Sequence, residues 1–189
     1  TPSIYSRLKD VKTTHGYTLD MAIRPGILEV TAKIGIVAGD EESYLSFKEL
    51  FDPVIEAWHG FKPDAVHRSD LDSSRITHGH VSNELVISTR IRAGRNIRGT
   101  PLPPAMSSEH RKEVMNLVQL ALSDMNKEFE GRFHDLSELA EEKKEELRND
   151  HFLFQEPTCD CHLTIINAAR DWPFNRGIFC NKDNTFFVW

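Results

Sequence analysis

Apolar positions in the first third of the chain recur at helical spacing. Residues 18–24 carry a short apolar pattern that stops at Pro25 and Gly26, which predicts a short helix ending there. A longer pattern covers residues 40–58, with apolar side chains three and four residues apart. These side chains are Tyr44, Phe47, Phe51, Val54, Ile55 and Trp58. Pro53 interrupts this pattern, so we expect a kink or the meeting point of two helices there.

The next segment, residues 59–83, has no apolar period. It contains Gly60, Pro63 and Gly79 among many polar residues. Structureless connections of this length are uncommon inside one compact domain. The pattern therefore predicts two domains, residues 1–83 with the linker and residues 84–189.

The second half mixes strand and helix patterns. Residues 85–92 look like a strand, and the serines at 107–108 are typical of the cap of a long helix. The apolar face of that helix is Val114, Leu117, Val118, Ala121, Met125 and Phe129. A second helix is expected over residues 137–148, with a charged outer face. Residues 176–189 predict two strands joined by a turn at 182–184.

Helices followed by a strand, more helices and a hairpin indicate an α+β protein. We expect a small all-α N-terminal domain followed by part of an α+β domain with an antiparallel sheet. The chain finishes on an apolar run, residues 186–189, whose unpaired strand edge would invite association. The expectation from this feature is that the sequence stops in the middle of a domain.

Composition narrows the classes of partner. The chain has 189 residues, 39% hydrophobic and 28% charged, as in ordinary globular proteins. Its net charge of −6 argues against nucleic acid or an anionic membrane as a partner. No apolar run approaches the roughly 20 residues that span a bilayer. Three cysteines are too few for a disulfide framework, which favours a reducing, cytoplasmic setting.

Four arginines stand out against this acidic background: Arg90, Arg92, Arg95 and Arg98. In a strand, Arg90 and Arg92 would lie on the same face. Two guanidinium groups side by side repel each other unless an anion lies between them, and phosphate matches their planar fork. The pattern therefore indicates a polyphosphate site. The alternative is a solvated basic strand edge that discourages aggregation.

Several segments along the chain carry a common likeness: residues 1–5, 16–20, 35–44, 50–55, 88–92 with 94–95, 150–154 and 169–173. Together they resemble the phosphagen (ATP:guanidino) kinase family, nearest its creatine kinase branch. The resemblance implies reversible transfer of the ATP γ-phosphoryl group to a guanidino nitrogen, with Mg²⁺ on the phosphates of ATP or ADP. It leaves creatine, glycocyamine, arginine, taurocyamine and lombricine open as substrates, and it implies a possible homodimer.

The resemblance also assigns roles to residues. It implies a nucleotide site formed by Ser88, Thr89, Arg90, Ile91, Arg92 and Cys180. It also implies a loop over the guanidino substrate formed by Ile34, Gly35, Ile36 and Val37. For Ile34, an apolar contact with substrate and a place in the core beside a hinge both remain open. Gly35 has no side chain and so permits a close backbone approach.

The sequence departs from the family in three ways. The family's catalytic carboxylates, its reactive cysteine and its further phosphate-binding arginines lie beyond the point that matches Trp189, so we expect no catalytic residue within this chain. Cys180 stands where the family has a histidine beside the nucleotide, and a thiol is a poor donor. The loop after Gly26 is shorter than in creatine kinases, which leaves room for a bulkier substrate.

Two functional interpretations follow. One is an ATP:guanidino phosphotransferase, of which residues 1–189 alone are expected to be inactive. The other is a catalytically inactive relative that binds a nucleotide or a partner. A metal site is not expected, because the spacing of Cys159, Cys161 and His162 does not match a paired zinc motif.

Overall fold

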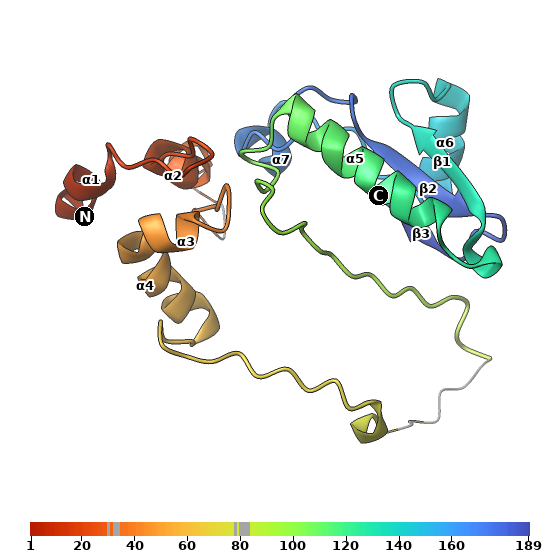
Figure 1. The fold of residues 1–189 in the computed structure, drawn as a ribbon, viewed down its shortest axis with the longest axis horizontal. Helices are drawn as coiled ribbons and strands as arrows, with labels where there is room; N and C mark the ends of the chain where they lie inside the picture. Colours follow the sequence, from red (N-terminus) through yellow and green to blue (C-terminus); the bar gives the residue numbers. More distant parts are fainter. Residues whose placement is uncertain (30, 32–34, 78, 80–83) are drawn as a thin grey trace.

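The computed structural model describes residues 1–29, 31, 35–77, 79 and 84–189. The first group of elements is α1 (Pro2–Leu8), α2 (Leu19–Leu28), α3 (Ser43–Ser46) and α4 (Lys48–His59). The second group is α5 (Ser108–Ser123), η2 (Lys127–Phe129), β1 (Gly131–Asp135), α6 (Glu141–Asn149), α7 (His162–Ile165), β2 (Gly177–Asn181) and β3 (Phe187–Val188), and a short turn η1 (Ser73–Arg75) lies between the groups. Figure 1 shows α1–α4 gathered on one side and the sheet with α5–α7 on the other. The α+β class is confirmed.

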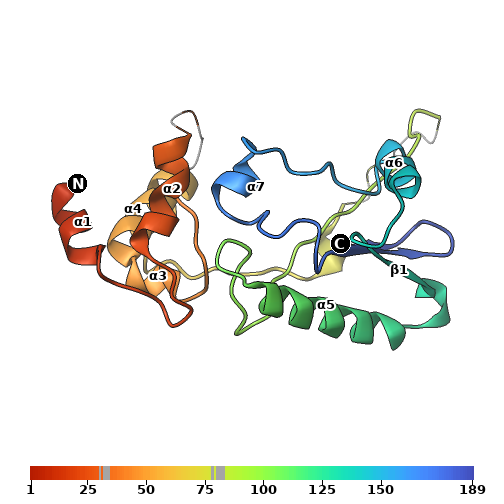
Figure 2. The same ribbon diagram turned by 90° about the horizontal axis from the view of Figure 1, so that it is seen from above.

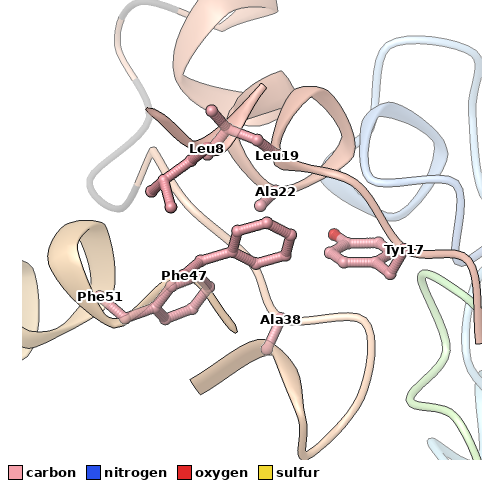
Figure 3. Packing of buried hydrophobic residues seen from close by; sticks show 7 residues of the cluster. All are labelled: Leu8, Tyr17, Leu19, Ala22, Ala38, Phe47 and Phe51. Carbon is pink, nitrogen blue, oxygen red and sulfur yellow. The ribbon is translucent and has the colours of Figure 1, made fainter. Parts of the chain in front are cut away.

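The N-terminal helices pack around one apolar cluster (Figure 3). We name this set of residues the N-terminal cluster: Leu8, Tyr17, Leu19, Ala22, Ala38, Phe47 and Phe51. Phe47 and Ala22 have no exposed surface, and Tyr17 is 1% exposed. The Tyr17 hydroxyl donates a hydrogen bond of 3.0 Å to the Val37 carbonyl, so its buried polar atom is satisfied.

The prediction that the helix at 18–24 ends at Pro25 and Gly26 is wrong. Helix α2 runs from Leu19 to Leu28 with Pro25 inside it. Pro25 has no N–H to donate, and the Gly26 N–H donates outside the helix, to the Gly35 carbonyl at 3.0 Å. The helix therefore continues because a neighbouring segment takes up the hydrogen bond that the proline disturbs.

The boundary inside residues 40–58 also differs from the prediction, because α3 and α4 meet at Phe47 and Pro53 lies within α4. Phe47 has φ −113° and ψ 26°, outside the helical range, and its ring fills the N-terminal cluster. Upstream, the Asp40 carboxylate accepts hydrogen bonds from the Ser43 N–H and hydroxyl at 2.8 and 2.7 Å. The Asp40 contacts thus fix the start of α3, and the break between α3 and α4 coincides with the burial of the Phe47 ring.

The sheet has the antiparallel order β1-β2-β3. Its register pairs Phe133 with Phe179 and Cys180 with Phe187. The predicted hairpin is confirmed, whereas β1 was not predicted. In the view of Figure 2 the sheet lies between α5 and α6.

Helix α5 begins as predicted but ends early. Ser107 and His110 form a reciprocal capping box at its start. The helix stops at Ser123, so Phe129 lies beyond it in η2. Leu117, expected on its buried face, is 50% exposed. The helix predicted over residues 137–148 is present only in its second part, as α6, which begins at Glu141 because residues 137–140 form a turn. Leu147 of α6 is buried against Ile178 and Cys180.

The described residues of the connection between the two groups, 60–77, 79 and 84–96, are exposed and largely extended (Figure 1). The predicted strand at residues 85–92 is wrong, since no strand is assigned there. Ile87 and Ile91 are 100% and 98% exposed. A strand needs a neighbour to accept its backbone hydrogen bonds, and none of the described residues supplies one.

After this connection the chain returns to the helical group. The Leu102 N–H donates to the Gly39 carbonyl at 2.8 Å, and Leu102 and Ala105 pack against the N-terminal cluster. Helix α2 also contacts α7. Nowhere in the described parts of the chain is a helix both long and apolar enough to cross a bilayer.

Candidate nucleotide site

The chain after α6 presents backbone and aromatic groups to the predicted phosphate site. The N–H groups of Phe152 and Leu153 both donate to the Leu147 carbonyl, at 2.8 and 3.0 Å. His151 adopts a φ of 60° in this turn. These contacts fix residues 151–154 against the end of α6. The segment therefore has a defined position although it belongs to no helix or strand.

Both central arginines reach this segment. We name residues 84–98 the arginine segment. The Arg90 Nη1 donates to the His151 carbonyl at 3.0 Å, and the Arg92 Cζ lies 5.4 Å from the centre of the Phe154 ring. The same Cζ lies 5.5 Å from the Trp189 ring. The two guanidinium groups are thus turned toward the same short stretch of chain, 61 residues away in sequence for Arg90.

No carboxylate within the described residues forms an ion pair with Arg90 or Arg92. Arg92 also makes no hydrogen bond among them, so its five N–H donors are free for a ligand. A guanidinium edge with unused donors is the group that binds phosphate oxygens in pairs. The positive charge and the unused donors of these arginines are therefore both compatible with phosphate binding.

Other arginines in the second group have a different environment. Arg111 is 7% exposed, pairs with Asp171 and donates to the Met106 carbonyl at 2.9 Å. Arg170 donates to the same carbonyl at 2.5 Å. Burial, reinforced by the nearby Arg111 charge, lowers the pKa of Arg176 to about 10. Arg111 and Arg170 thus join the start of α5 to the loop after α7, whereas Arg176 donates to carbonyls within that loop.

An aromatic network supports the Arg92 contact, and sequence reasoning missed it. The Trp189 Nε1–H donates to the Phe152 carbonyl at 2.5 Å. Phe152 stacks on Phe187 of β3 with ring centres 4.3 Å apart. The only sequence signals were the family likeness of residues 150–154 and the apolar end of the chain. Neither signal states which cation the rings would meet.

The remaining residues predicted to bind the nucleotide differ in their burial. Ser88, Thr89 and Ile91 are exposed and belong to no strand. Cys180 is 8% exposed and packs with Leu147 in the core on the α6 side of the sheet. Burial raises the pKa of the Cys180 thiol. The described contacts link Cys180 to Arg92 indirectly: its strand neighbour Phe187 stacks on Trp189, and Phe152 packs against the same cluster as Cys180.

The predicted substrate loop is described only in part, because Ile34 lies outside the described residues. The backbone at Gly35 approaches helix α2 closely, because a Cβ added to Gly26 would lie 2.8 Å from the Gly35 carbonyl oxygen. The Val37 N–H donates to the Ala22 carbonyl at 2.9 Å, and Ile36 packs against the N-terminal cluster. The end of the loop is therefore held firmly to α2.

Two other features lie apart from this site. A pocket of about 320 Å³ opens beside α4 and is lined by Tyr44, Asp52, Ile55, Phe61, Lys62, Pro63, Ala65 and His67. None of the predicted site residues lines it. The cysteines are free, and among the described residues no three His, Cys, Asp or Glu side chains come together as metal ligands.

The helical group and the group with the antiparallel sheet correspond in order to two domains of one protein family. The N-terminal domain model of the ATP:guanido phosphotransferases matches residues 1–56. The C-terminal catalytic domain model of the same family matches residues 113–189. Because the two match in order and together cover more than half of the chain, this chain belongs to the ATP:guanido phosphotransferase (phosphagen kinase) family. The arginine segment lies between the two matched ranges.

Individual relatives agree with this assignment over the whole chain. An arginine kinase of Stichopus japonicus is 42% identical over 190 residues, covering 100% of this chain and 51% of that protein. A crystal structure of lombricine kinase superposes with a TM-score of 0.91 at 41% identity, covering 100% of this chain and 52% of that one. The duplicated taurocyamine kinase of Schistosoma mansoni, with bound transition-state analogue components, gives 0.82 at 32% identity, covering 100% of this chain and 27% of that one.

Two facts follow from these relatives. The chain spans about half the length of the arginine kinase and of the lombricine kinase. The names of these relatives are arginine, lombricine and taurocyamine kinase, so they give no specific support to the creatine kinase branch.

Proposed function

We propose that this chain takes part in the reversible transfer of the ATP γ-phosphoryl group to a guanidino substrate. The observation that carries the proposal is the pair Arg90 and Arg92, which face one segment without a carboxylate partner among the described residues. Phosphoryl transfer needs little covalent help from the protein, and its catalysis is chiefly positioning and neutralisation of phosphate charge. Two such cations supply part of that neutralisation.

The proposed division of labour follows the two domains, residues 1–83 and 84–189. The first would cover the guanidino substrate with its loop, including Ile34, Gly35, Ile36 and Val37. The second would bind ATP or ADP, with Arg90 and Arg92 on the phosphates and Ser88 and Thr89 as additional donors. Mg²⁺ would arrive on the nucleotide phosphates as part of the substrate.

The substrate itself is proposed only as a guanidino compound. Relatives named for arginine, lombricine and taurocyamine favour these three, and creatine and glycocyamine stay within the proposal. The shorter loop after Gly26 favours the bulkier compounds. We also propose a cytoplasmic location and a possible homodimer.

A second candidate is a nucleotide-binding or partner-binding protein without catalysis. Cys180 favours it, because its thiol is buried in the sheet core and because the family resemblance implies a histidine at this position beside the nucleotide. For the 189-residue polypeptide itself we expect negligible turnover, because the family resemblance implies that the catalytic carboxylates match positions outside residues 1–189. A coupled ATP assay with a panel of guanidino compounds checks this, and clear phosphotransfer above blank would refute it.

Calorimetric titration tests the nucleotide role itself. We expect MgADP to bind and adenosine, which has no phosphate, to bind at least about tenfold more weakly, because hydrogen bonds to charged groups contribute about 1.5–3 kcal/mol. Equal affinity for the two ligands would show that the arginines do not bind phosphate. No binding of either ligand would leave the partner-binding role as the better candidate.

A further inference from the structure

We propose that Phe154 and Trp189 form an aromatic seat that fixes the Arg92 guanidinium with its edge open to the nucleotide phosphates. This inference deepens the proposed function and rests on it. Phe154 acts here as a positioning residue, because it works through Arg92.

The geometry is that of a seat rather than a sandwich. The Arg92 Cζ lies 5.4 Å from the Phe154 centre and 5.5 Å from the Trp189 centre, both within cation–π range. The two ring centres are themselves only 5.3 Å apart, with planes tilted by 50°. Three nearly equal separations mean that the cation rests over the junction of two touching rings. Rings on opposite sides of the guanidinium would be about twice as far apart.

This contact leaves the phosphate-binding groups of Arg92 unused. Cation–π attraction acts on the guanidinium through the faces of the rings, whereas hydrogen bonds to phosphate use the in-plane N–H groups. Arg92 makes no hydrogen bond or ion pair within the described residues. The seat therefore restrains the cation without neutralising its charge or occupying its donors.

Such restraint matters because of where Arg92 lies. The arginine segment has no ladder hydrogen bonds, and Ile91 next to Arg92 is 98% exposed. A long side chain on such a backbone would lose rotamer freedom when it binds phosphate, and restraint before binding reduces that cost. The seat is anchored to the sheet, because Trp189 donates to the Phe152 carbonyl and Phe152 stacks on Phe187 of β3.

A double-mutant cycle with MgADP titration tests this role. We expect Phe154→Leu to weaken MgADP binding about threefold to fivefold, the effect of a partly exposed cation–π contact. In the Arg92→Ala background the same change should alter affinity less than twofold, while Phe154→Tyr should retain wild-type affinity. Phe174→Leu is the matched control, since Phe174 is 58% exposed and makes no cation–π contact among the described residues. An equal loss from Phe154→Leu with and without Arg92 would overturn the inference.

A second readout needs no nucleotide. Protons of the Arg92 side chain should show upfield ring-current shifts in NMR spectra, relative to Arg95, and Phe154→Leu should reduce them. Normal Arg92 shifts in a chain that binds MgADP would refute the seat and leave the proposed function standing. Upfield shifts in a chain that binds no MgADP would confirm the contact but refute its role toward phosphate, together with the proposed nucleotide function.

Discussion

The N-terminal cluster and the arginine segment use their apolar residues in opposite ways. In the cluster, Phe47 is completely buried and its position decides where two helices meet. In the arginine segment, Ile87 is completely exposed, and the contacts that hold the chain come from Arg90 and Arg92. Stability should therefore depend on the first region. Ligand affinity should depend on the second.

The largest expected effect on stability comes from emptying the N-terminal cluster. Phe47→Ala should lower the free energy of unfolding by about 3–5 kcal/mol, because it removes a fully buried ring and leaves a cavity. Ile87→Ala, at an exposed position of similar apolar character, should change it by less than about 0.5 kcal/mol. Urea unfolding followed by circular dichroism measures both. Similar losses for the two variants would erase the contrast between the regions.

A smaller effect is expected from adding one methyl group. A Cβ on Gly39 would lie 2.2 Å from the Tyr17 ring, so Gly39→Ala should cost about 1–3 kcal/mol through overpacking. Gly94 in the arginine segment has nothing within 4 Å of such a Cβ. Gly94→Ala should leave stability unchanged or raise it by up to about 1 kcal/mol. Thermal unfolding of the two variants checks this, and a destabilised Gly94→Ala would show hidden packing in the segment.

The smallest effect concerns a surface contact of the helical group. The Thr14 N–H donates to the Glu42 carboxylate at 2.7 Å and lowers the pKa of Glu42. A lowered pKa contributes stability above the unfolded-state value of about 4.3, and this contribution is lost as the pH falls through the folded-state value. Glu42→Gln should therefore be less stable than wild type at pH 7 and equally stable at low pH. Glu56→Gln, at an exposed glutamate, is the control. A Glu42→Gln deficit that persists below pH 3 would contradict this prediction.

Sequence patterns predicted elements whose causes are local. The hairpin of β2 and β3 followed from its turn residues, and α5 followed from the serine cap at Ser107. Strand β1 was missed because Phe133 is its one large apolar residue, so it shows no apolar alternation. Its partner strand β2 also lies more than 40 residues later in the chain. The meeting of α3 and α4 at Phe47 depends on tertiary burial, which no local pattern carries.

Of the candidate site, the sequence predicted the two arginines but not the residues that they contact. The spacing of Arg90 and Arg92 indicated a shared face, and both side chains do reach residues 151–154. The expected strand did not form, so the shared direction comes from the contacts with His151 and Phe154 instead. These partners are about 60 residues away, and contacts between distant segments cannot be read from a local period. The same reason explains why the burial of Cys180 was not foreseen.

The central claim is that Arg90 and Arg92 bind nucleotide phosphates, and one calorimetric comparison tests it most directly. The variant Arg90→Ala/Arg92→Ala and the control Arg95→Ala/Arg98→Ala remove the same charge from the same segment. We predict that the first loses MgADP affinity by at least about tenfold, as expected for charged hydrogen bonds, and that the second stays within about threefold of wild type. Equal losses in the two variants would mean that only the overall charge matters, which would contradict the account.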